Sequence, residues 1–187
     1  MDIVVEQGAL FAISLIANGL SALAGGGAGL LQLPALLFLG LAFGTALATH
    51  KIASVALGVG ATFRHIKEKG INPRFAGFIL LSGLPGVVLG ALVILAVPDS
   101  IARLVLGVFT AGLGLYSWRS PQLGLASSVK HRDLSGWLIG GAGLFFIGFL
   151  NGSITSGTGL FVTLWLVVWF GFDYQRAVTY TLILVGL

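Results

Sequence analysis

A histidine and a lysine stand side by side within an apolar stretch of the sequence, residues 43–63. Placing a lysine in a membrane helix costs about 2.5–3.5 kcal/mol on insertion scales, so such a side chain generally faces a wet cavity or a counter-charge. In a cavity, Lys51 would supply the positive charge that an anion needs, and His50 could exchange a proton near neutral pH. The alternative is that Lys51 extends its flexible stem to the lipid headgroups, since it lies only about two turns from the end of the segment.

Glycines interrupt two other apolar stretches. Residues 8–41 would form a single helix of about 51 Å, which is too long for one crossing of a hydrocarbon core of about 30 Å. The three successive glycines at 25–27 would weaken a helix there. We therefore expect the chain to break and turn back, either as two short spans or as a re-entrant pair of half-helices. A second break is expected at residues 156–159.

Each break creates a helix start with exposed N–H groups and about half a unit of positive charge. Two facing breaks would offer converging donors to a small anion, and small side chains would let the backbone approach it. The candidate substrate-binding residues, from the breaks, the repeated asparagines and the polar tripeptide at 49–51, are Asn18, Gly25, Gly26, Gly27, Gly29, Thr49, His50, Lys51, Asn151, Ser156, Gly157, Thr158 and Gly159.

Other polar residues and glycines have a simpler structural interpretation. Further polar residues near the breaks could bind the anion or bond across helices: Ser21, Gln32, Ser153, Thr155 and Thr163. The scattered glycines are interpreted as positions of close helix packing: Gly83, Gly86, Gly90, Gly107, Gly112 and Gly114.

The composition indicates a membrane protein. The chain of 187 residues is 57% hydrophobic and 9% charged, with a mean hydropathy of +1.04. Soluble domains carry about 25% charged residues. These values exclude an ordinary cytosolic globule and a disordered tail, and the lack of cysteine excludes a disulfide scaffold. The net charge of only +4 argues against nucleic-acid binding. We predict an all-α, polytopic bundle whose first partner is the lipid bilayer.

Charge placement predicts the topology. We expect helices at residues 8–24, 28–41, 43–63, 75–97, 100–117, 135–151, 159–170 and 174–187. Segment 64–74 carries four basic residues against one acid, and segment 119–133 carries three against one. Both should be cytoplasmic by the positive-inside rule. Because the first segment is expected to double back, this arrangement places the N-terminus outside.

The sequence contains an internal repeat. Asn18-Gly19 recurs as Asn151-Gly152, and Gly40 recurs as Gly171. Residues 1–134 would form the first repeat, a broken pair plus three spans, and residues 135–187 a truncated second repeat, a broken pair plus one span. The three spans of the first repeat are an odd number of crossings, so the second copy enters the membrane from the opposite side. Inverted repeats with broken helices are typical of transporters whose binding site lies near the bilayer midplane. A further C-terminal portion or a second copy of the chain would complete the fold.

Enzyme motifs are missing from the sequence. The GGGAG run lacks the preceding strand and the later acid of a dinucleotide fingerprint, and no P-loop lysine follows it. Neither a Gly-x-Ser-x-Gly elbow nor an HExxH motif occurs. We therefore expect no enzymatic activity, no cofactor and no metal site.

The first glycine-rich segment resembles a known family signature. Residues 25–36, Gly-Gly-Gly-Ala-Gly-Leu-Leu-Gln-Leu-Pro-Ala-Leu, are similar to the signature of the TauE/SafE sulfite-exporter family. A similar second signature runs from Gly157 to Gly159, with Gly171 following it. The resemblance implies a secondary transporter of sulfite, sulfonates or related small organic anions in the cytoplasmic membrane. The second copy lacks a proline matching Pro34, and the helices that end the family's fold do not follow it here.

The sequence therefore predicts a secondary transporter of small anions, of the sulfite or sulfonate class, coupled to protons. Two alternatives stay open: a passive anion channel, and a membrane subunit or fragment that does not transport. Saturation and proton coupling would distinguish a transporter from a channel. The sequence leaves open the substrate, the direction of transport, the coupling ion and the oligomeric state.

Overall fold

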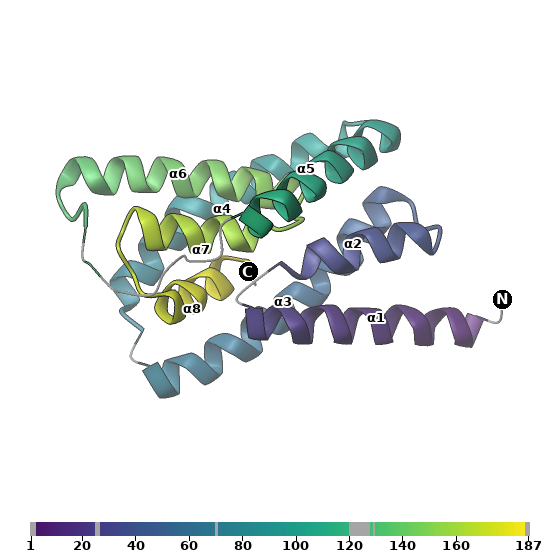
Figure 1. The fold of residues 1–187 in the computed structure, drawn as a ribbon, viewed down its shortest axis with the longest axis horizontal. Helices are drawn as coiled ribbons and strands as arrows, with labels where there is room; N and C mark the ends of the chain where they lie inside the picture. The colour runs from purple at the N-terminus through teal and green to yellow at the C-terminus, as the bar shows by residue number, and fades with distance from the viewer. Residues whose placement is uncertain (1–2, 25–26, 70, 120–127, 129, 186–187) are drawn as a thin grey trace.

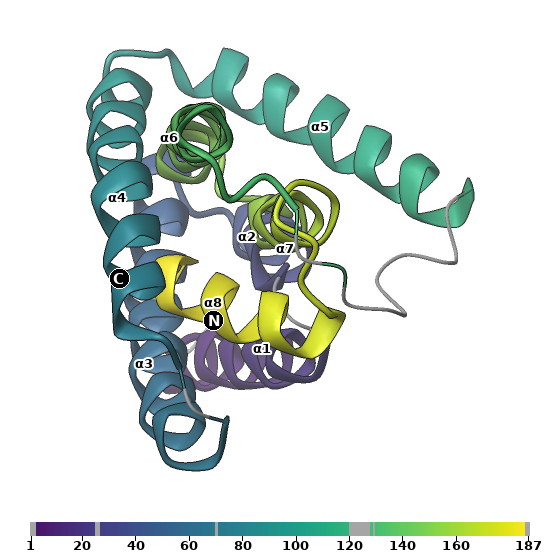
Figure 2. The same cartoon turned by 90° about the vertical axis from the view of Figure 1, so that its left-hand side faces the viewer.

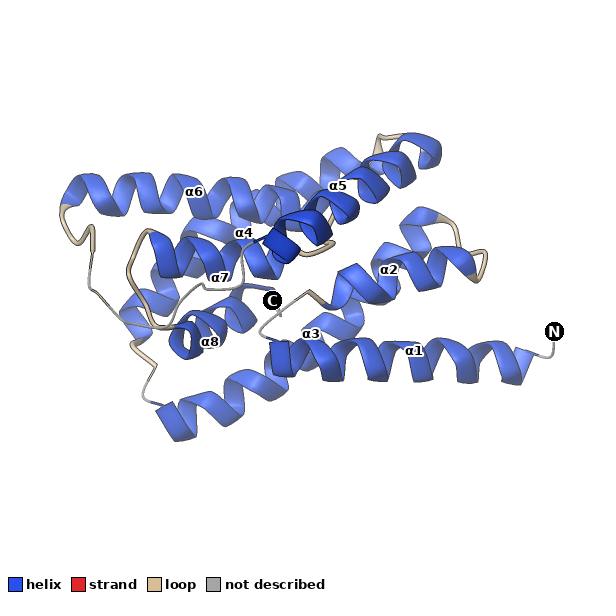
Figure 3. Cartoon of the chain, in the orientation of Figure 1, coloured by secondary structure: helices blue, strands red, loops and turns tan. Residues whose placement is uncertain are grey.

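The computed structural model describes residues 3–24, 27–69, 71–119, 128 and 130–185. Every regular element in these ranges is an α helix, as Figure 3 shows, which confirms the all-α prediction. The helices in chain order are α1 (Ile3–Ala24), α2 (Ala28–Phe38), α3 (Phe43–Lys69), α4 (Pro73–Leu95), α5 (Asp99–Arg119), α6 (Leu134–Ser153), α7 (Thr158–Val168) and α8 (Tyr174–Val185).

The outer surface is apolar, and polar side chains lie inside. Phe38 is 91% exposed and Leu81 is 81% exposed, whereas Gln32 is fully buried and His50 is 1% exposed. This distribution suits a lipid environment, where apolar groups face outward at no cost. Among the described residues, α4 and α6 are each long and apolar enough to cross a membrane, judged by length and composition. The fold is that of a helical membrane bundle.

Glycines bring α4 and α6 into close contact, and the two helices lie side by side in Figure 2. A Cβ atom added to Gly86 would lie 2.1 Å from the carbonyl oxygen of Phe145, and one on Gly90 would lie 2.1 Å from that of Phe149. One on Gly148 would lie 2.3 Å from the carbonyl oxygen of Gly83. The backbones touch without intervening side chains, as in small-xxx-small packing. The packing interpretation is confirmed for Gly83, Gly86 and Gly90.

Two glycines of α5 show no such packing within the described residues. A Cβ atom added to Gly107 or Gly112 would have no atom of the described chain within 4 Å. These positions lie on faces of α5 that no described helix covers, so close packing cannot be their role within this part of the chain. Gly114 lies outside the described side chains.

Two helix pairs enter the bundle from opposite ends. In Figure 1, α1 runs from one end of the long axis to the middle, and α2 returns toward the same end. Helix α6 runs from the other end to the middle, and α7 returns. Helices α2 and α7 each have 11 residues, or about 17 Å at 1.5 Å per residue. Each is therefore about half as long as a full crossing needs, and each follows one of the predicted breaks.

Most predicted boundaries agree with the structure to within three residues, with two exceptions. Helix α1 begins at Ile3 rather than at residue 8, and α3 ends at Lys69 rather than at residue 63. Residues 64–69, expected in a loop, form the end of α3. Basic residues are good helix formers, so the helix continues past the apolar stretch. Helix α2 ends earlier than expected because Gly40 adopts φ +89° in the turn that follows. Gly171, its predicted counterpart, adopts φ +72° after α7. The division into repeats at residue 134 stays a prediction.

Candidate functional site

The two helix breaks lie against each other in the middle of the bundle (Figure 1). A Cβ atom added to Gly29 would lie 3.1 Å from the carbonyl oxygen of Thr155 and 3.1 Å from the Cα of Ser156. The Ser156 hydroxyl donates a 3.5 Å hydrogen bond to the carbonyl oxygen of Gly29. The first turns of α2 and α7, with their partial positive charge, therefore begin close to one another.

A left-handed glycine precedes each of these two helices. Gly27 has φ +95° directly before α2, and Gly157 has φ +70° directly before α7. Only glycine adopts this conformation readily, because it has no Cβ atom. Thr155 also has a positive φ, of +61°, and its hydroxyl is held by a 2.5 Å hydrogen bond to the carbonyl oxygen of Asn151. The glycines of the breaks thus stand where the chain turns back.

His50 on α3 faces the meeting point of the breaks. Its Nδ1 lies 2.7 Å from Oε1 of Gln32, and an amide oxygen can only accept, so Nδ1 carries the hydrogen. In the neutral ring Nε2 is then an acceptor, and the Ser54 hydroxyl lies 3.3 Å from it. Nε2 is also 3.2 Å from the Cβ position of Gly29. The second ring nitrogen of His50 is therefore directed at the start of α2.

A small cavity lies between these groups. Its lining includes Gly27, Gly29, His50, Thr155 and Gly159. Its volume is about 10 Å³, which is enough for roughly one water molecule. An anion as large as sulfite does not fit unless the surrounding helices move. The site is closed in this structure.

Lys51 points away from this cavity, toward the end of α6. Its Nζ donates a 2.6 Å hydrogen bond to the carbonyl oxygen of Asn151, which lies in the last turn of α6. A cation at this end of a helix is favourable, because the final carbonyl groups carry partial negative charge. The ammonium group is held inside the bundle at the second break, so the headgroup alternative for Lys51 is wrong.

Asn151 connects Lys51 to the start of α7. Its side-chain oxygen accepts a 2.7 Å hydrogen bond from the hydroxyl of Thr158, the first residue of α7. Its carbonyl oxygen accepts from both Lys51 and Thr155. The residue therefore joins the end of α6, the turn and the start of α7 in one hydrogen-bonded unit.

Comparison with known proteins places the chain in a family. The profile of the sulfite exporter TauE/SafE family matches residues 10–187. The chain belongs to the TauE/SafE family. A "Probable membrane transporter protein" of Haemophilus influenzae is 33% identical over 178 residues, which are 95% of this chain and 69% of that protein. The "Probable membrane transporter protein YfcA" of Escherichia coli is 29% identical over 180 residues, 95% of this chain and 65% of that protein.

A third relative is also named as a membrane transporter. The "Probable membrane transporter protein ORF9" of Sinorhizobium sp is 28% identical over 172 residues, 92% of this chain and 65% of that protein. The chain thus spans about two thirds of the length of the curated relatives it matches. No solved structure matches it. The family and these relatives identify a chain of the membrane-transporter class, located in a membrane.

The structure of this TauE/SafE chain brings most of the predicted site residues together, with four exceptions. Gly25 and Gly26 lie outside the described residues. Thr49 turns to another face of α3, where it lines a groove beside α1 and its hydroxyl bonds to the carbonyl oxygen of Thr45. Asn18 lies behind the cavity and reaches it only through Gln32, to which it donates a 3.0 Å hydrogen bond.

Two polar residues of the site went unnoticed in the sequence. Ser54 lies one turn after His50 on the same face of α3, a spacing that could have revealed it. Ser14 accepts a 2.7 Å hydrogen bond from the amide nitrogen of Gln32, and no local pattern distinguishes it from the other residues of α1. Gln32, noted in the sequence as one of several polar residues near the breaks, proves to be the centre of this network.

Proposed function

We propose that this chain is a secondary transporter that moves small anions of the sulfite or sulfonate class across the cytoplasmic membrane, coupled to protons. The observation that carries the proposal is the meeting of two helix starts beside His50. The TauE/SafE family supports the same class of substrate, since its name is that of sulfite exporters. The anion would bind between the breaks, at Gly25–Gly29 on one side and Ser156–Gly159 on the other.

The local charges favour a negative solute. The starts of α2 and α7 each contribute partial positive charge from backbone N–H groups. Lys51 adds a full charge one residue after His50, close to the second break through Asn151. No acidic side chain lines the cavity among the described residues. An oxyanion would therefore find N–H donors, hydroxyl groups and a nearby cation without an opposing carboxylate.

His50 offers a place for the coupled proton. Gln32 holds Nδ1, so a proton can be exchanged only at Nε2, the nitrogen that faces Gly29. A proton at Nε2 adds positive charge beside the anion, so the two would bind together. The ring would release the proton when the anion leaves.

The closed cavity favours a carrier over a channel. The cavity that the described residues form, with a volume of about 10 Å³, is too small to hold an anion. Carriers of the broken-helix type move one helix group against another around a fixed site. In this chain α2 and α7 would have to separate from each other to admit the substrate.

Uptake of radiolabelled sulfite into proteoliposomes tests the proposal. The rate should saturate with sulfite concentration and rise when a pH gradient of one polarity is imposed. Gly29→Val should strongly reduce uptake because the added atoms collide with Thr155 and Ser156. His50→Gln should remove the stimulation by the pH gradient. Ile52→Ala, at a 73% exposed neighbour on the same helix, is the matched control and should transport normally.

Other outcomes of these uptake measurements would support one of the alternatives or contradict the proposed site. Flux that never saturates and ignores the pH gradient would indicate an anion channel. A folded protein with no flux at all would indicate a subunit that needs further components. Wild-type flux in both Gly29→Val and Lys51→Gln would remove the site between the breaks.

A further inference from the structure

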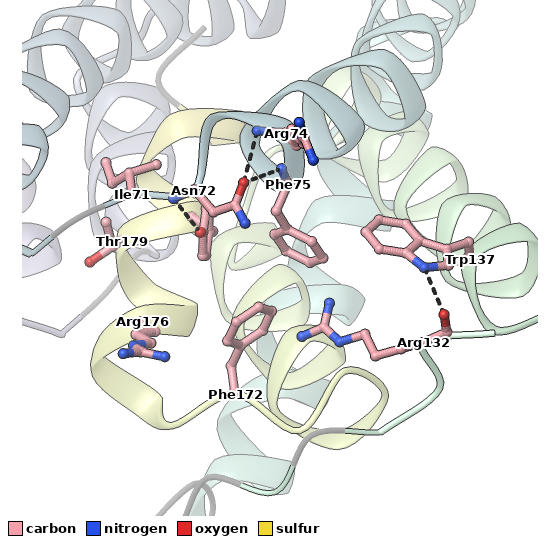
Figure 4. A pocket seen from close by; sticks show the side chains of 10 residues that line it. Ile71, Asn72, Arg74, Phe75, Arg132, Trp137, Phe172, Arg176 and Thr179 are labelled. Atoms are coloured by element: carbon pink, nitrogen blue, oxygen red, sulfur yellow. Dashed lines mark hydrogen bonds between the residues drawn. The ribbon is translucent and has the colours of Figure 1, made fainter. Parts of the chain in front are cut away.

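A second, larger pocket lies at one end of the bundle, apart from the helix breaks. It has a volume of about 370 Å³ and lies where the link between α3 and α4 meets the starts of α6 and α8 (Figure 4). Three arginines from separate parts of the chain line it: Arg74, Arg132 and Arg176.

Arg132 is held in place by aromatic rings. Its guanidinium carbon lies 5.0 Å from the ring centre of Phe172, 5.1 Å from that of Phe75 and 5.4 Å from that of Phe170. Figure 4 shows the guanidinium group beside Phe172. Partial burial lowers the pKa of Arg132, but an arginine keeps its charge at neutral pH. The cation is therefore fixed before any ligand arrives.

All three arginines are exposed, and no acid lines the pocket among the described residues. Arg74 is exposed, and the side chain of Arg176 is 65% exposed. None of the residues that line the pocket is an aspartate or a glutamate. Asp173 forms a 3.7 Å ion pair with Arg176 at the edge. Three positive charges against one paired carboxylate leave the pocket with an excess of positive charge.

We infer that this arginine pocket binds an oxyanion group, either of a soluble sulfur oxyanion or of an anionic lipid headgroup. Guanidinium groups bind sulfur and phosphorus oxyanions through paired N–H donors. Its volume exceeds that of a bare oxyanion, so it has room for an attached organic part next to Phe75 and Phe172. The pocket lies outside the break site, and the inference does not depend on the proposed transport.

The position of the pocket supports this assignment. Arg74 belongs to the basic segment 64–74 and Arg132 to the basic segment 119–133, and the structure brings both to one pocket. Both segments were predicted to lie on the cytoplasmic side. Trp137 and Tyr180 also line the pocket, and such residues are frequent at the membrane–water interface. An anion would meet this pocket at the surface of the membrane.

Tryptophan fluorescence provides the test, since Trp137 lines the pocket. The purified chain in phosphatidylcholine vesicles is titrated with sodium sulfate, with sodium chloride at equal ionic strength as the control. In a second arm, phosphatidylglycerol replaces part of the phosphatidylcholine. We expect a saturable change in emission with at least one of the two ligands. The double variant Arg74→Gln/Arg176→Gln should raise the half-saturating concentration by roughly tenfold or more.

The control variants separate this pocket from other sites. Arg119→Gln removes one positive charge from an exposed position outside the pocket and should bind normally. Lys51→Gln should also bind normally, even where it abolishes transport. Arg74→Lys/Arg176→Lys retains both charges and should recover part of the affinity. A response to sulfate alone assigns a soluble oxyanion, and a response to phosphatidylglycerol alone assigns a lipid headgroup. No saturable response to either ligand, an unchanged double variant or a loss of binding in Lys51→Gln would overturn the inference.

Discussion

The side-chain oxygen of Gln32 lies 2.7 Å from Nδ1 of His50, and both residues are buried. The same oxygen accepts from Asn18, and the amide nitrogen of Gln32 donates to Ser14. This network fixes the histidine ring and leaves only Nε2 facing the helix breaks. One residue of α2 thereby determines which nitrogen of α3 can interact with a ligand.

Replacing Gln32 tests this network. Gln32→Leu would leave Nδ1 of His50 and the amide of Asn18 with one partner fewer, which should destabilise the protein by about 1–3 kcal/mol. The measurement is thermal unfolding of the detergent-purified protein. Gln7→Leu, at an exposed position of α1, is the control and should unfold like the wild type. Equal unfolding temperatures for Gln32→Leu and wild type would show that the network carries little energy.

Gly29 offers a test of the contact between the breaks. In Gly29→Ala the new methyl group would lie 3.1 Å from the backbone of Thr155 and Ser156 and 3.2 Å from His50. These neighbours would have to move by a few tenths of an ångström, so sulfite uptake should fall severalfold while the protein still folds. Gly44→Ala, where nothing lies within 4 Å, should transport at the normal rate. A normal rate in Gly29→Ala would show that the contact tolerates movement and that tight approach is not needed.

The sequence alone predicted the helices and the breaks well. Glycine and proline mark most of the helix ends, and left-handed Gly27 and Gly157 stand where helices α2 and α7 begin. The end of α3 was predicted too early, because the change from apolar to basic residues was interpreted as the end of the helix. In a membrane protein such a change marks the limit of the hydrocarbon region, and a helix can continue beyond it.

The side chains that meet at the site were harder to predict. A soluble helix reveals its inner face by apolar periodicity, but α3 is apolar toward lipid and toward its neighbours alike. For this reason Thr49 was expected at the site, whereas Ser54 is the residue that lies there. The bond between Lys51 and Asn151 joins residues 100 positions apart, and no local pattern contains such a pair.

The crossing of α4 and α6 should be sensitive to a single methyl group. In Gly90→Ala the new Cβ would lie 2.1 Å from the carbonyl oxygen of Phe149, so the two helices must move apart. Overpacking of this kind costs about 1–3 kcal/mol, which thermal unfolding in detergent would detect. Gly77→Ala on the same helix meets nothing within 4 Å and is the matched control. Identical unfolding of the two variants would contradict the close packing.

Lys51 has two potential roles, and two substitutions separate them. Lys51→Gln keeps a donor for the carbonyl oxygen of Asn151 but removes the charge, whereas Lys51→Arg keeps both. If the charge attracts the anion, sulfite uptake should fall at least tenfold in Lys51→Gln and persist in Lys51→Arg, with similar unfolding temperatures. Arg103→Gln, which removes a charge from the exposed start of α5, should leave uptake unchanged. If Lys51→Gln transports at the wild-type rate, Lys51 only stabilises the end of α6, and the charge for the anion must come from the two helix starts.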